Sequence, residues 1–183
     1  MNPQNKKQPY RVLCLGNVLA DILVKPVDVL PTVGGLLAVD HIGMAIGGCA
    51  SNTAVVLSRL GVPTSLWGKL GRDLFGDFVL KELKRAGVET SGLVIDKKTD
   101  TSATLVLVNS KAQRSFLHSM AANDLIYKKE LRLSKLSQFR HLHVGGYFLF
   151  SALDGKPMAD ILKQAKGKGV TTSLDTAWDL RGR

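Results

Sequence analysis

The stretch that most constrains the fold is YRVLCLGNV, residues 10–18, because it is apolar at almost every position after Arg11. A strand with one face in water alternates apolar and polar residues, whereas a strand buried on both faces of a parallel sheet is apolar throughout. Parallel strands are joined by crossover connections, which are usually helices. The run therefore predicts a core strand of an α/β protein.

Helical and strand patterns alternate along the rest of the chain. The expected helices cover residues 51–60, 73–87, about 128–137 and about 154–167, and the expected strands cover 64–71, 141–148 and 169–175. This order predicts an open αβα sandwich with a mostly parallel sheet and helices on both faces. We expect Ser51 or Asn52 to cap the first helix and Asp73 to cap the second. The buried stripe of the second helix is expected to hold Leu74, Phe75, Phe78, Val79, Leu83 and Ala86.

Two β-rich segments, about 22–46 and 93–120, interrupt this alternation. In the second segment, SATLVLVN and RSFLHSM flank the polar turn SKAQ, which indicates a β-hairpin. We expect both segments to form one small sheet, a lid over the functional site. Residues 10–183 are expected to form a single, incomplete α/β domain, preceded by a flexible N-terminus over residues 1–9.

The net charge of +10 over 183 residues raises the question of nucleic-acid binding. The lysines and arginines are spread over several segments, no aromatic residues interleave with them, and no nucleic-acid motif is present. A solvated basic face, or a bias towards anionic small molecules, explains the charge better. No apolar run is long enough for a membrane span, and no signal sequence is apparent. The two cysteines form no disulfide framework, so the expected location is the cytoplasm.

The four histidines show no metal-ligand spacing, and no metal site is predicted. His141 and His143 alternate with apolar residues and are expected to share one face of a strand. A structural role is the favoured interpretation of this pair.

The stretch IGGCASNTAVVLSRLG, residues 46–61, places two glycines directly before a helix. Gly47 and Gly48 would let a ligand approach the backbone, and the start of the helix offers unpaired N–H groups. Asn52 adds a donor and an acceptor in the first turn. The pattern suits a polyhydroxyl or anionic ligand, but a tight turn before a capped helix explains it equally well. It matches neither the dinucleotide fingerprint nor a phosphate-binding loop.

Other candidate residues stand at predicted strand ends, where open α/β sheets bind ligands. Asp21 follows the first core strand, and its carboxylate could accept hydrogen bonds from two adjacent hydroxyls. Taken alone, it is better explained as a loop carboxylate that caps backbone N–H groups. Gly146 follows the strand HLHV, and Asp175 ends the strand GVTTSLD. Three such strand ends together make a site more plausible than any one of them.

Residues 47–71, GGCASNTAVVLSRLGVPTSLWGKLG, resemble the N-terminal signature of the PfkB (ribokinase-like) family of carbohydrate kinases. The two glycines and Asn52 stand at the spacing of that signature, as do the small or turn residues Ala50, Ala54, Gly61 and Gly71. GNVLAD resembles the family's first strand with its sugar-contacting aspartate. TSATLVLVNSKAQRSFLHSMAAN resembles its lid hairpin, and HVGGYFL and SLDTAW resemble later strand ends. The resemblance covers nearly all of residues 10–183.

The resemblance implies a ribokinase-like αβα sandwich with a small β lid. It also implies transfer of the γ-phosphoryl group of ATP, with Mg²⁺, to a hydroxyl of a sugar or nucleoside. By matching position, Asp21, Gly47, Gly48 and Asn52 would hold the sugar hydroxyls. Arg114 on the hairpin could reach the ligand, although a solvated lid arginine is an equal alternative. Asp175 would lie towards the nucleotide, and pairing through the lids would give a homodimer.

The chain departs from the family at the second signature, a Gly-Ala-Gly-Asp type turn that supplies the catalytic base. No such motif occurs in the sequence, and Gly145-Gly146 is followed by Tyr147. The C-terminal part of the fold and most of the nucleotide site are therefore expected to be missing. We expect the chain to be the N-terminal portion of a sugar kinase, inactive on its own and without a catalytic residue.

Two other functions stay open. The first is a non-catalytic sugar-binding or interaction module, the product of a truncated or decayed gene. A dinucleotide-binding enzyme is a distant third, because no triple-glycine turn precedes Asp21. The identity of the sugar is not decided by these residues.

Overall fold

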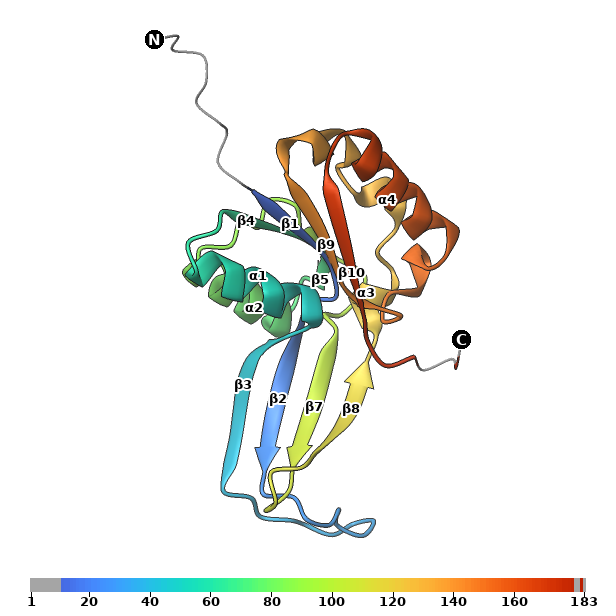
Figure 1. Ribbon diagram of the computed structural model, residues 1–183. Helices are drawn as coiled ribbons and strands as arrows, with labels where there is room; N and C mark the ends of the chain where they lie inside the picture. The colour runs from blue at the N-terminus through green and yellow to red at the C-terminus, as the bar shows by residue number, and fades with distance from the viewer. Residues whose placement is uncertain (1–10, 180–181, 183) are drawn as a thin grey trace.

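The computed structural model of the protein describes residues 11–179 and residue 182 (Figure 1). The flexible N-terminus expected over residues 1–9 lies outside the described residues. Among the described helices, none is long and apolar enough to cross a bilayer.

The centre of the molecule is a parallel sheet with the strand order β10-β9-β1-β4. Its strands are β1 (Val12–Gly16), β4 (Thr64–Trp67), β9 (His141–Tyr147) and β10 (Thr171–Thr176). All five residues of β1 are buried, as the apolar run predicts for a strand with covered faces. The parallel core sheet is therefore confirmed.

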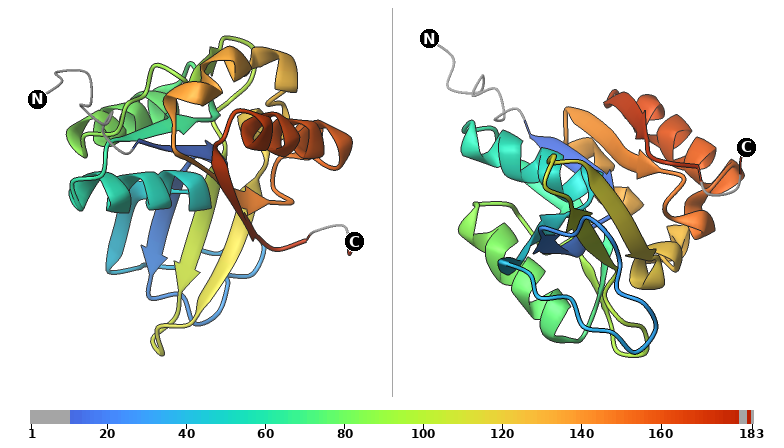
Figure 2. Two further views of the ribbon diagram at one scale, coloured as in Figure 1. Left: turned by 45° about the horizontal axis from the view of Figure 1, so that its top comes forward. Right: turned by 90° about the horizontal axis from the view of Figure 1, so that it is seen from below.

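Helices cover both faces of this sheet, and the side chains of β1 alternate between them. Val12 and Cys14 pack with α1 (Cys49–Arg59) and α2 (Leu74–Arg85). Leu13 and Leu15 face the opposite way, towards α4 (Lys156–Gly167) and η2 (Leu133–Gln138). Successive strand residues point to opposite faces, so one short strand serves two hydrophobic cores. The expected open αβα sandwich is confirmed, and Figure 2 shows the layers from two further directions.

The cap of the first helix differs from the sequence prediction, whereas that of the second agrees with it. The first helix begins after Gly48, with no side-chain cap, and Ser51 instead donates back to the carbonyl oxygens of Gly47 and Gly48. In α2, Asp73 is the cap as predicted, since its carboxylate accepts the N–H of Gly76 at 2.7 Å.

The buried stripe of α2 was predicted correctly at Val79 and Leu83, and Phe78 and Ala86 pack against the same core, but Leu74 and Phe75 were wrongly included. Leu74 is 86% exposed and Phe75 is 38% exposed, whereas Gly76, Val79 and Leu83 are buried. Leu74 precedes Gly76 by two positions, which at 100° per residue points it away from the buried side.

The helix expected over residues 128–137 is also different, because the structure has two short 3₁₀ helices there. They are η1 (Lys128–Glu130) and η2 (Leu133–Gln138), separated by Leu131 and Arg132. Leu131 and Leu136 both enter the core, and their spacing of five does not fit one face of an α-helix. Two further short elements, α3 (Ala121–Asp124) and η3 (Ser151–Leu153), flank the start and end of this region.

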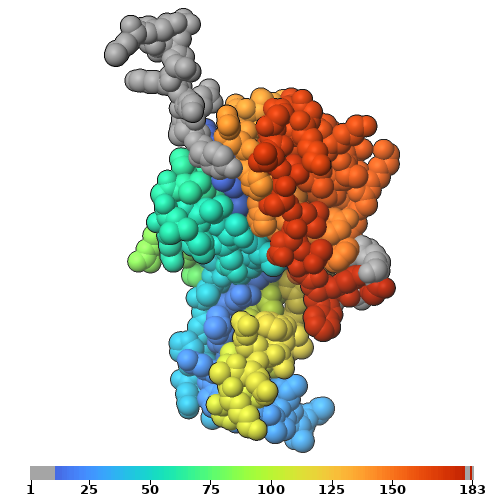
Figure 3. Space-filling view, viewed as in Figure 1, coloured from blue at the N-terminus to red at the C-terminus, as the bar shows by residue number. Residues whose placement is uncertain are grey.

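A second four-stranded sheet, with the order β3-β2-β7-β8, projects from one end of the α/β layers (Figures 1 and 3). Its strands are β2 (Leu19–Lys25), β3 (His41–Gly47), β7 (Ala103–Val108) and β8 (Arg114–Ser119). We call it the lid sheet. The hairpin of β7 and β8 is confirmed by their antiparallel register. Close by, β5 (Lys69–Gly71) and β6 (Val94–Asp96) form a separate two-stranded sheet.

Strand β2 begins at Leu19, and this changes the position of Asp21. The sequence predicted Asp21 just past a core strand, but Asp21 is the third residue of β2 in the lid sheet. The chain passes from β1 to β2 through only Asn17 and Val18. The core strand and the lid strand are therefore almost continuous, and the lid starts where the core strand ends.

Candidate functional site

The carboxylate of Asp21 lies directly against the backbone of Gly47. The antiparallel register pairs Leu19 with Gly47 and Asp21 with Ala45. A Cβ atom built on Gly47 would lie 2.4 Å from both Cγ and Oδ1 of Asp21. Position 47 therefore has no room for a side chain, and the carboxylate faces the turn that opens α1.

That turn needs glycine at its next position as well. Gly48 has φ +100°, and a Cβ atom there would lie 2.5 Å from the carbonyl oxygen of Asn17. The N–H of Cys49 donates to Oδ1 of Asn17 at 2.9 Å. The first turn of α1 contains no acidic residue, so its partial positive charge is not offset from within the turn.

Asn17 also meets the end of β9. A Cβ atom on Gly146, which has φ +80°, would lie 2.2 Å from Oδ1 of Asn17. A Cβ atom on Gly145 would lie 2.8 Å from the nitrogen of Ala50, in the first turn of α1. Bare backbone from β9 thus packs against the start of α1, and the buried Asn17 joins the two.

Sequence reasoning missed Asn17, although one signal was available. It is a polar residue at the end of an otherwise apolar strand, and such a residue is buried only when its hydrogen bonds are made. Asn123 has a related role, since its Oδ1 accepts the N–H of Val18 at 3.2 Å. Together these two amides hold the short connection between β1 and the lid sheet.

On the lid sheet, Asp21 belongs to a polar row that the sequence did not reveal. The register aligns Asp21 with Thr104 of β7, and Thr104 with His118 of β8. The Oγ1 atom of Thr104 lies 2.9 Å from Nδ1 of His118. Burial lowers the pKa of His118. Neither Thr104 nor His118 stands out in the sequence, because only the strand register places them beside Asp21.

The pKa of Asp21 is raised, and the main cause is burial. Hydrogen bonding to Thr104 and the charge of Arg114 act in the opposite direction. Arg114 is exposed on β8, with its guanidinium 5.9 Å from the ring centre of Phe116. It shares the lid face of Asp21 but lies further from the turn, so the structure places it near the site without showing a contact with Gly47 or Gly48.

Asn52 lies on the outer side of the same helix start. It is exposed and borders a hollow lined by Met44, Ala45 and Ile46 of the edge strand β3. Asp21 does not line this hollow. The structure therefore brings Asp21, Gly47, Gly48 and Gly146 together, whereas Asn52 stands at their margin.

Asp175 also lies near the start of α1, because its charge acts on Cys49. It is exposed on β10, where it pairs with Gly145 of β9. Burial raises the pKa of Cys49, and the negative charges of Asp175 and Asp21 raise it further. Two carboxylates thus lie close enough to Cys49, at the start of α1, for their charges to act on its thiol.

The two histidines of β9 share one face of the strand, as predicted. Nδ1 of His141 lies 2.8 Å from Oγ1 of Thr171, and Nδ1 of His143 lies 2.8 Å from Oγ of Ser173. Burial lowers the pKa of His143, while Asp175 acts against this. Among the described residues, no group of three or more His, Cys, Asp or Glu side chains could hold a metal ion.

An apolar cavity of about 410 Å³ lies beside the lid sheet. It is lined by Phe116 and His118 from β8, Leu149 from the segment after β9, and Trp178 from the segment after β10. The lid and the carboxyl ends of the core strands therefore enclose space next to the row of Asp21 and Thr104.

Comparison with known proteins finds a matching family and several relatives of this chain. The family described as pfkB family carbohydrate kinase matches residues 10–182. The chain is 27% identical over 172 residues to Fructokinase-2 of Oryza sativa, covering 92% of this chain and 49% of that protein. It is 31% identical over 153 residues to Probable fructokinase-4 of Arabidopsis thaliana, covering 81% of this chain and 47% of that protein.

Solved structures that resemble this chain include a fructokinase and a ribokinase. The crystal structure of fructokinase from Xylella fastidiosa aligns with a TM-score of 0.74 at 25% identity, covering 92% of this chain and 50% of that one. Ribokinase from Giardia lamblia aligns with a TM-score of 0.79 over 95% of this chain and 52% of its own, and at 18% identity it shows the fold alone. This chain spans about half the length of the relatives it matches. On the match over residues 10–182, the chain belongs to the pfkB family of carbohydrate kinases.

Proposed function

We propose that this chain is the N-terminal, substrate-binding portion of an ATP-dependent sugar kinase. The single observation that carries the proposal is the carboxylate of Asp21 held against bare Gly47 at the start of α1. An ionised carboxylate accepts several hydrogen bonds, so it can bind two neighbouring hydroxyls of one sugar. The glycine turn lets the sugar approach the backbone closely.

The other proposed contacts surround this pair. Gly48 and Gly146 would leave room for the ring of the sugar, and Asn52 would bind a hydroxyl at the margin of the site. Arg114 would approach from the lid. The lid sheet would exclude water, which matters because phosphoryl transfer depends on positioning and water competes with the sugar hydroxyl.

For the substrate we propose a ketohexose such as fructose. Support comes from the relatives, several of which are named fructokinases, among them the rice and Xylella fastidiosa proteins. Fructose presents adjacent hydroxyls of the kind that one carboxylate can bind in pairs.

ATP and Mg²⁺ are the proposed cofactors of the whole protein. The solved structures include a Xylella fastidiosa fructokinase with bound ATP and an Escherichia coli putative ribokinase II with ATP and Mg²⁺. When bound, ATP supplies the phosphoryl group and Mg²⁺ neutralises the charge of the phosphates. Within the described part of this chain no cluster of ligands fits Mg²⁺, and Asp175 is the one carboxylate that we place towards the nucleotide. The chain's own contribution is therefore the binding and orientation of the sugar.

Calorimetric titration of the purified chain with fructose tests the proposal. We expect saturable binding that weakens roughly tenfold or more in Asp21→Asn, because a hydrogen bond to a charged group is worth about 1.5–3 kcal/mol. Asp77→Asn, on the exposed side of α2, is the matched control and is expected to bind as the parent chain does. Equal binding by both variants, or no binding of any simple sugar by the folded chain, would contradict the proposal.

Catalysis is a separate question, because no Gly-Ala-Gly-Asp turn occurs in residues 1–183. We expect no turnover by this chain, and sugar-dependent formation of ADP by chain freed of contaminating kinases would overturn that expectation. The alternative function, a non-catalytic sugar-binding or interaction module, shares the same site. The coding sequence downstream of Arg183 separates the two, since only the kinase requires the missing turn in frame.

A further inference from the structure

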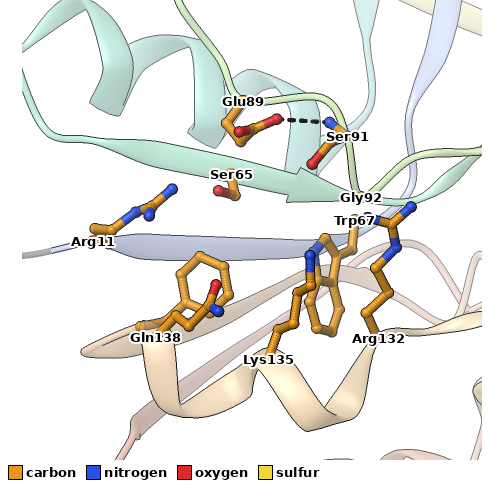
Figure 4. A pocket seen from close by; sticks show the side chains of 10 residues that line it. Arg11, Ser65, Trp67, Glu89, Ser91, Gly92, Arg132, Lys135 and Gln138 are labelled. Atoms are coloured by element: carbon orange, nitrogen blue, oxygen red, sulfur yellow. Dashed lines mark hydrogen bonds between the residues drawn. The ribbon is translucent and has the colours of Figure 1, made fainter.

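A second, polar cavity lies far from Asp21, against the edge strand β4 (Figure 4). It measures about 160 Å³ and opens between the start of β1, strand β4 with the neighbouring segment 89–92, and η2. Arg11 precedes β1, whereas the candidate sugar site begins beyond Gly16 at the other end. Five residues of strand separate these ends by roughly 16 Å.

Three cationic side chains from two separate parts of the chain line this cavity. Arg11 comes from the start of β1, and Arg132 and Lys135 come from η2 and the residue before it (Figure 4). One carboxylate, that of Glu89, also lines it. In the described part of the chain, none of these three cations forms an ion pair within 4.0 Å. The cavity therefore carries an excess of positive charge that the protein leaves unpaired.

Glu89 lies close enough to two of these cations for their charges to act on it. Its Oε1 atom accepts the N–H of Ser91 at 2.8 Å. That hydrogen bond is the main cause of the lowered pKa of Glu89, and the charges of Arg11 and Lys135 contribute. Arg11 and Lys135 line the same cavity as Glu89 and act on its carboxylate, so an anion in the cavity would feel their charges as well.

Aromatic side chains form a rigid wall of the cavity. Trp67 and Phe139 are buried and meet edge to face, with ring centres 6.0 Å apart. The guanidinium of Arg11 lies 5.8 Å from the ring centre of Phe139, which holds it over the aromatic face. Trp67 packs so closely that a Cβ atom on Gly92 would lie 2.0 Å from its Cδ1. The wall is formed before any ligand arrives, which reduces the entropy cost of binding.

We propose that this cavity is a binding site for a phosphate group, distinct from the sugar site. Guanidinium groups match the oxygens of phosphate in a two-pronged geometry, and lysine adds a compact charge. Three cations and one carboxylate leave two positive charges, which a phosphate dianion neutralises and a single carboxylate does not. Ser65, Ser91 and Gln138 add polar groups to the lining. The volume is far above the roughly 10–15 Å³ that one water molecule needs.

The chain offers an internal probe for this site, because it has two tryptophans and only Trp67 lines the cavity. In Trp178→Phe, tryptophan fluorescence reports on Trp67 alone. Inorganic phosphate is titrated at constant ionic strength against chloride, followed by a sugar phosphate and the same sugar without phosphate. We expect saturable responses to phosphate and to the ester and none to the free sugar. Tighter binding of inorganic phosphate identifies the free ion as the ligand, and tighter binding of the sugar phosphate identifies a phosphate ester.

The variants that test the site replace exposed side chains, so we expect them to fold as the parent chain does. Lys135→Gln and Arg132→Gln are each expected to weaken binding roughly tenfold or more, as the loss of a charged hydrogen bond predicts. Lys163→Gln, the same exchange on the exposed side of α4, is the control and is expected to bind as the parent does. Glu89→Gln removes the opposing charge and is expected to tighten binding.

The variants distinguish binding of phosphate at this site from non-specific attraction of anions to a basic protein. Weakening by the same factor in Lys163→Gln, a response that does not saturate, or no effect of Glu89→Gln would overturn the proposal. Asp21→Asn is expected to leave phosphate binding unchanged. The phosphate site and the sugar site can therefore fail independently.

Discussion

The carboxylate of Asp21 occupies the space that a side chain on Gly47 would need, with Cγ of Asp21 only 2.4 Å from the position of such a Cβ atom. The two residues are 26 positions apart in the sequence and come from adjacent strands of the lid sheet. Asp21 supplies a carboxylate and Gly47 supplies bare backbone, and the proposed sugar site uses both.

Gly47→Ala is expected to disturb this pair. The new methyl group collides with the carboxylate, and overpacking of this kind costs about 1–3 kcal/mol. We expect lower stability in urea unfolding and loss of fructose binding. Gly167→Ala is the control, because a Cβ atom there meets nothing within 4 Å and the backbone angle is ordinary. If the two alanine variants prove equally stable, Asp21 does not press on Gly47.

Asn17→Ala is expected to loosen the start of α1. It removes the acceptor of the Cys49 N–H, and a buried donor left unpaired costs about 1–3 kcal/mol. Asn17→Asp keeps an acceptor oxygen and is expected to retain more stability. Urea unfolding of the three proteins measures the difference, and equal midpoints would show that the amide does not hold the helix start.

The raised pKa of Asp21 predicts a pH dependence of stability. A carboxyl group with a higher pKa in the folded state binds its proton more tightly there, so stability falls as pH rises from 3.8 to the folded pKa. Asn cannot ionise, so Asp21→Asn does not lose this stability as pH rises and should be more stable than the parent at pH 7. The difference should vanish below pH 3.8, and a difference that does not change with pH would contradict this account.

Sugar binding should depend on pH in the opposite direction. The ionised carboxylate is the form that accepts hydrogen bonds from hydroxyls, and its pKa is raised. Affinity for fructose is therefore expected to fall as the solution is acidified, and to do so at a higher pH than an ordinary aspartate would require. Calorimetry at a series of pH values measures this, and constant affinity down to the ordinary pKa would exclude Asp21 as the acceptor.

The outer face of the lid sheet predicts a dimer. Ile42 is 67% exposed, Met44 43% and Leu117 58%, and the strand register places these side chains on the face opposite Asp21. Pairing of two lids would cover them. We expect light scattering to show a dimer that Leu117→Asp converts to monomer, whereas Leu60→Asp, at an exposed leucine just after α1, leaves the dimer intact. A monomeric parent chain would refute the pairing.

The sequence by itself determined the class of fold and most of the order of strands and helices, although the helix expected over residues 128–137 is two 3₁₀ helices. The apolar run of β1, the cap at Asp73 and the hairpin of β7 and β8 are local patterns, and local periodicity survives into the folded state. It also pointed to the two glycines before α1 and to Asp21. The roles of these residues in sugar binding remain predictions, as do those of Asn52, Arg114 and Asp175.

Tertiary structure alone decided the rest, because the remaining relationships join residues that are distant in sequence. Asn17 accepts the N–H of Cys49 and packs against Gly146 only because the fold brings the ends of β1 and β9 to the start of α1. His118 reaches Thr104 only through the strand register. The same holds for Leu74, which is apolar but faces water because of how α2 lies on the sheet. Sequence periodicity describes an element by itself, whereas contacts depend on sheet order and register, which are set by packing over the whole chain.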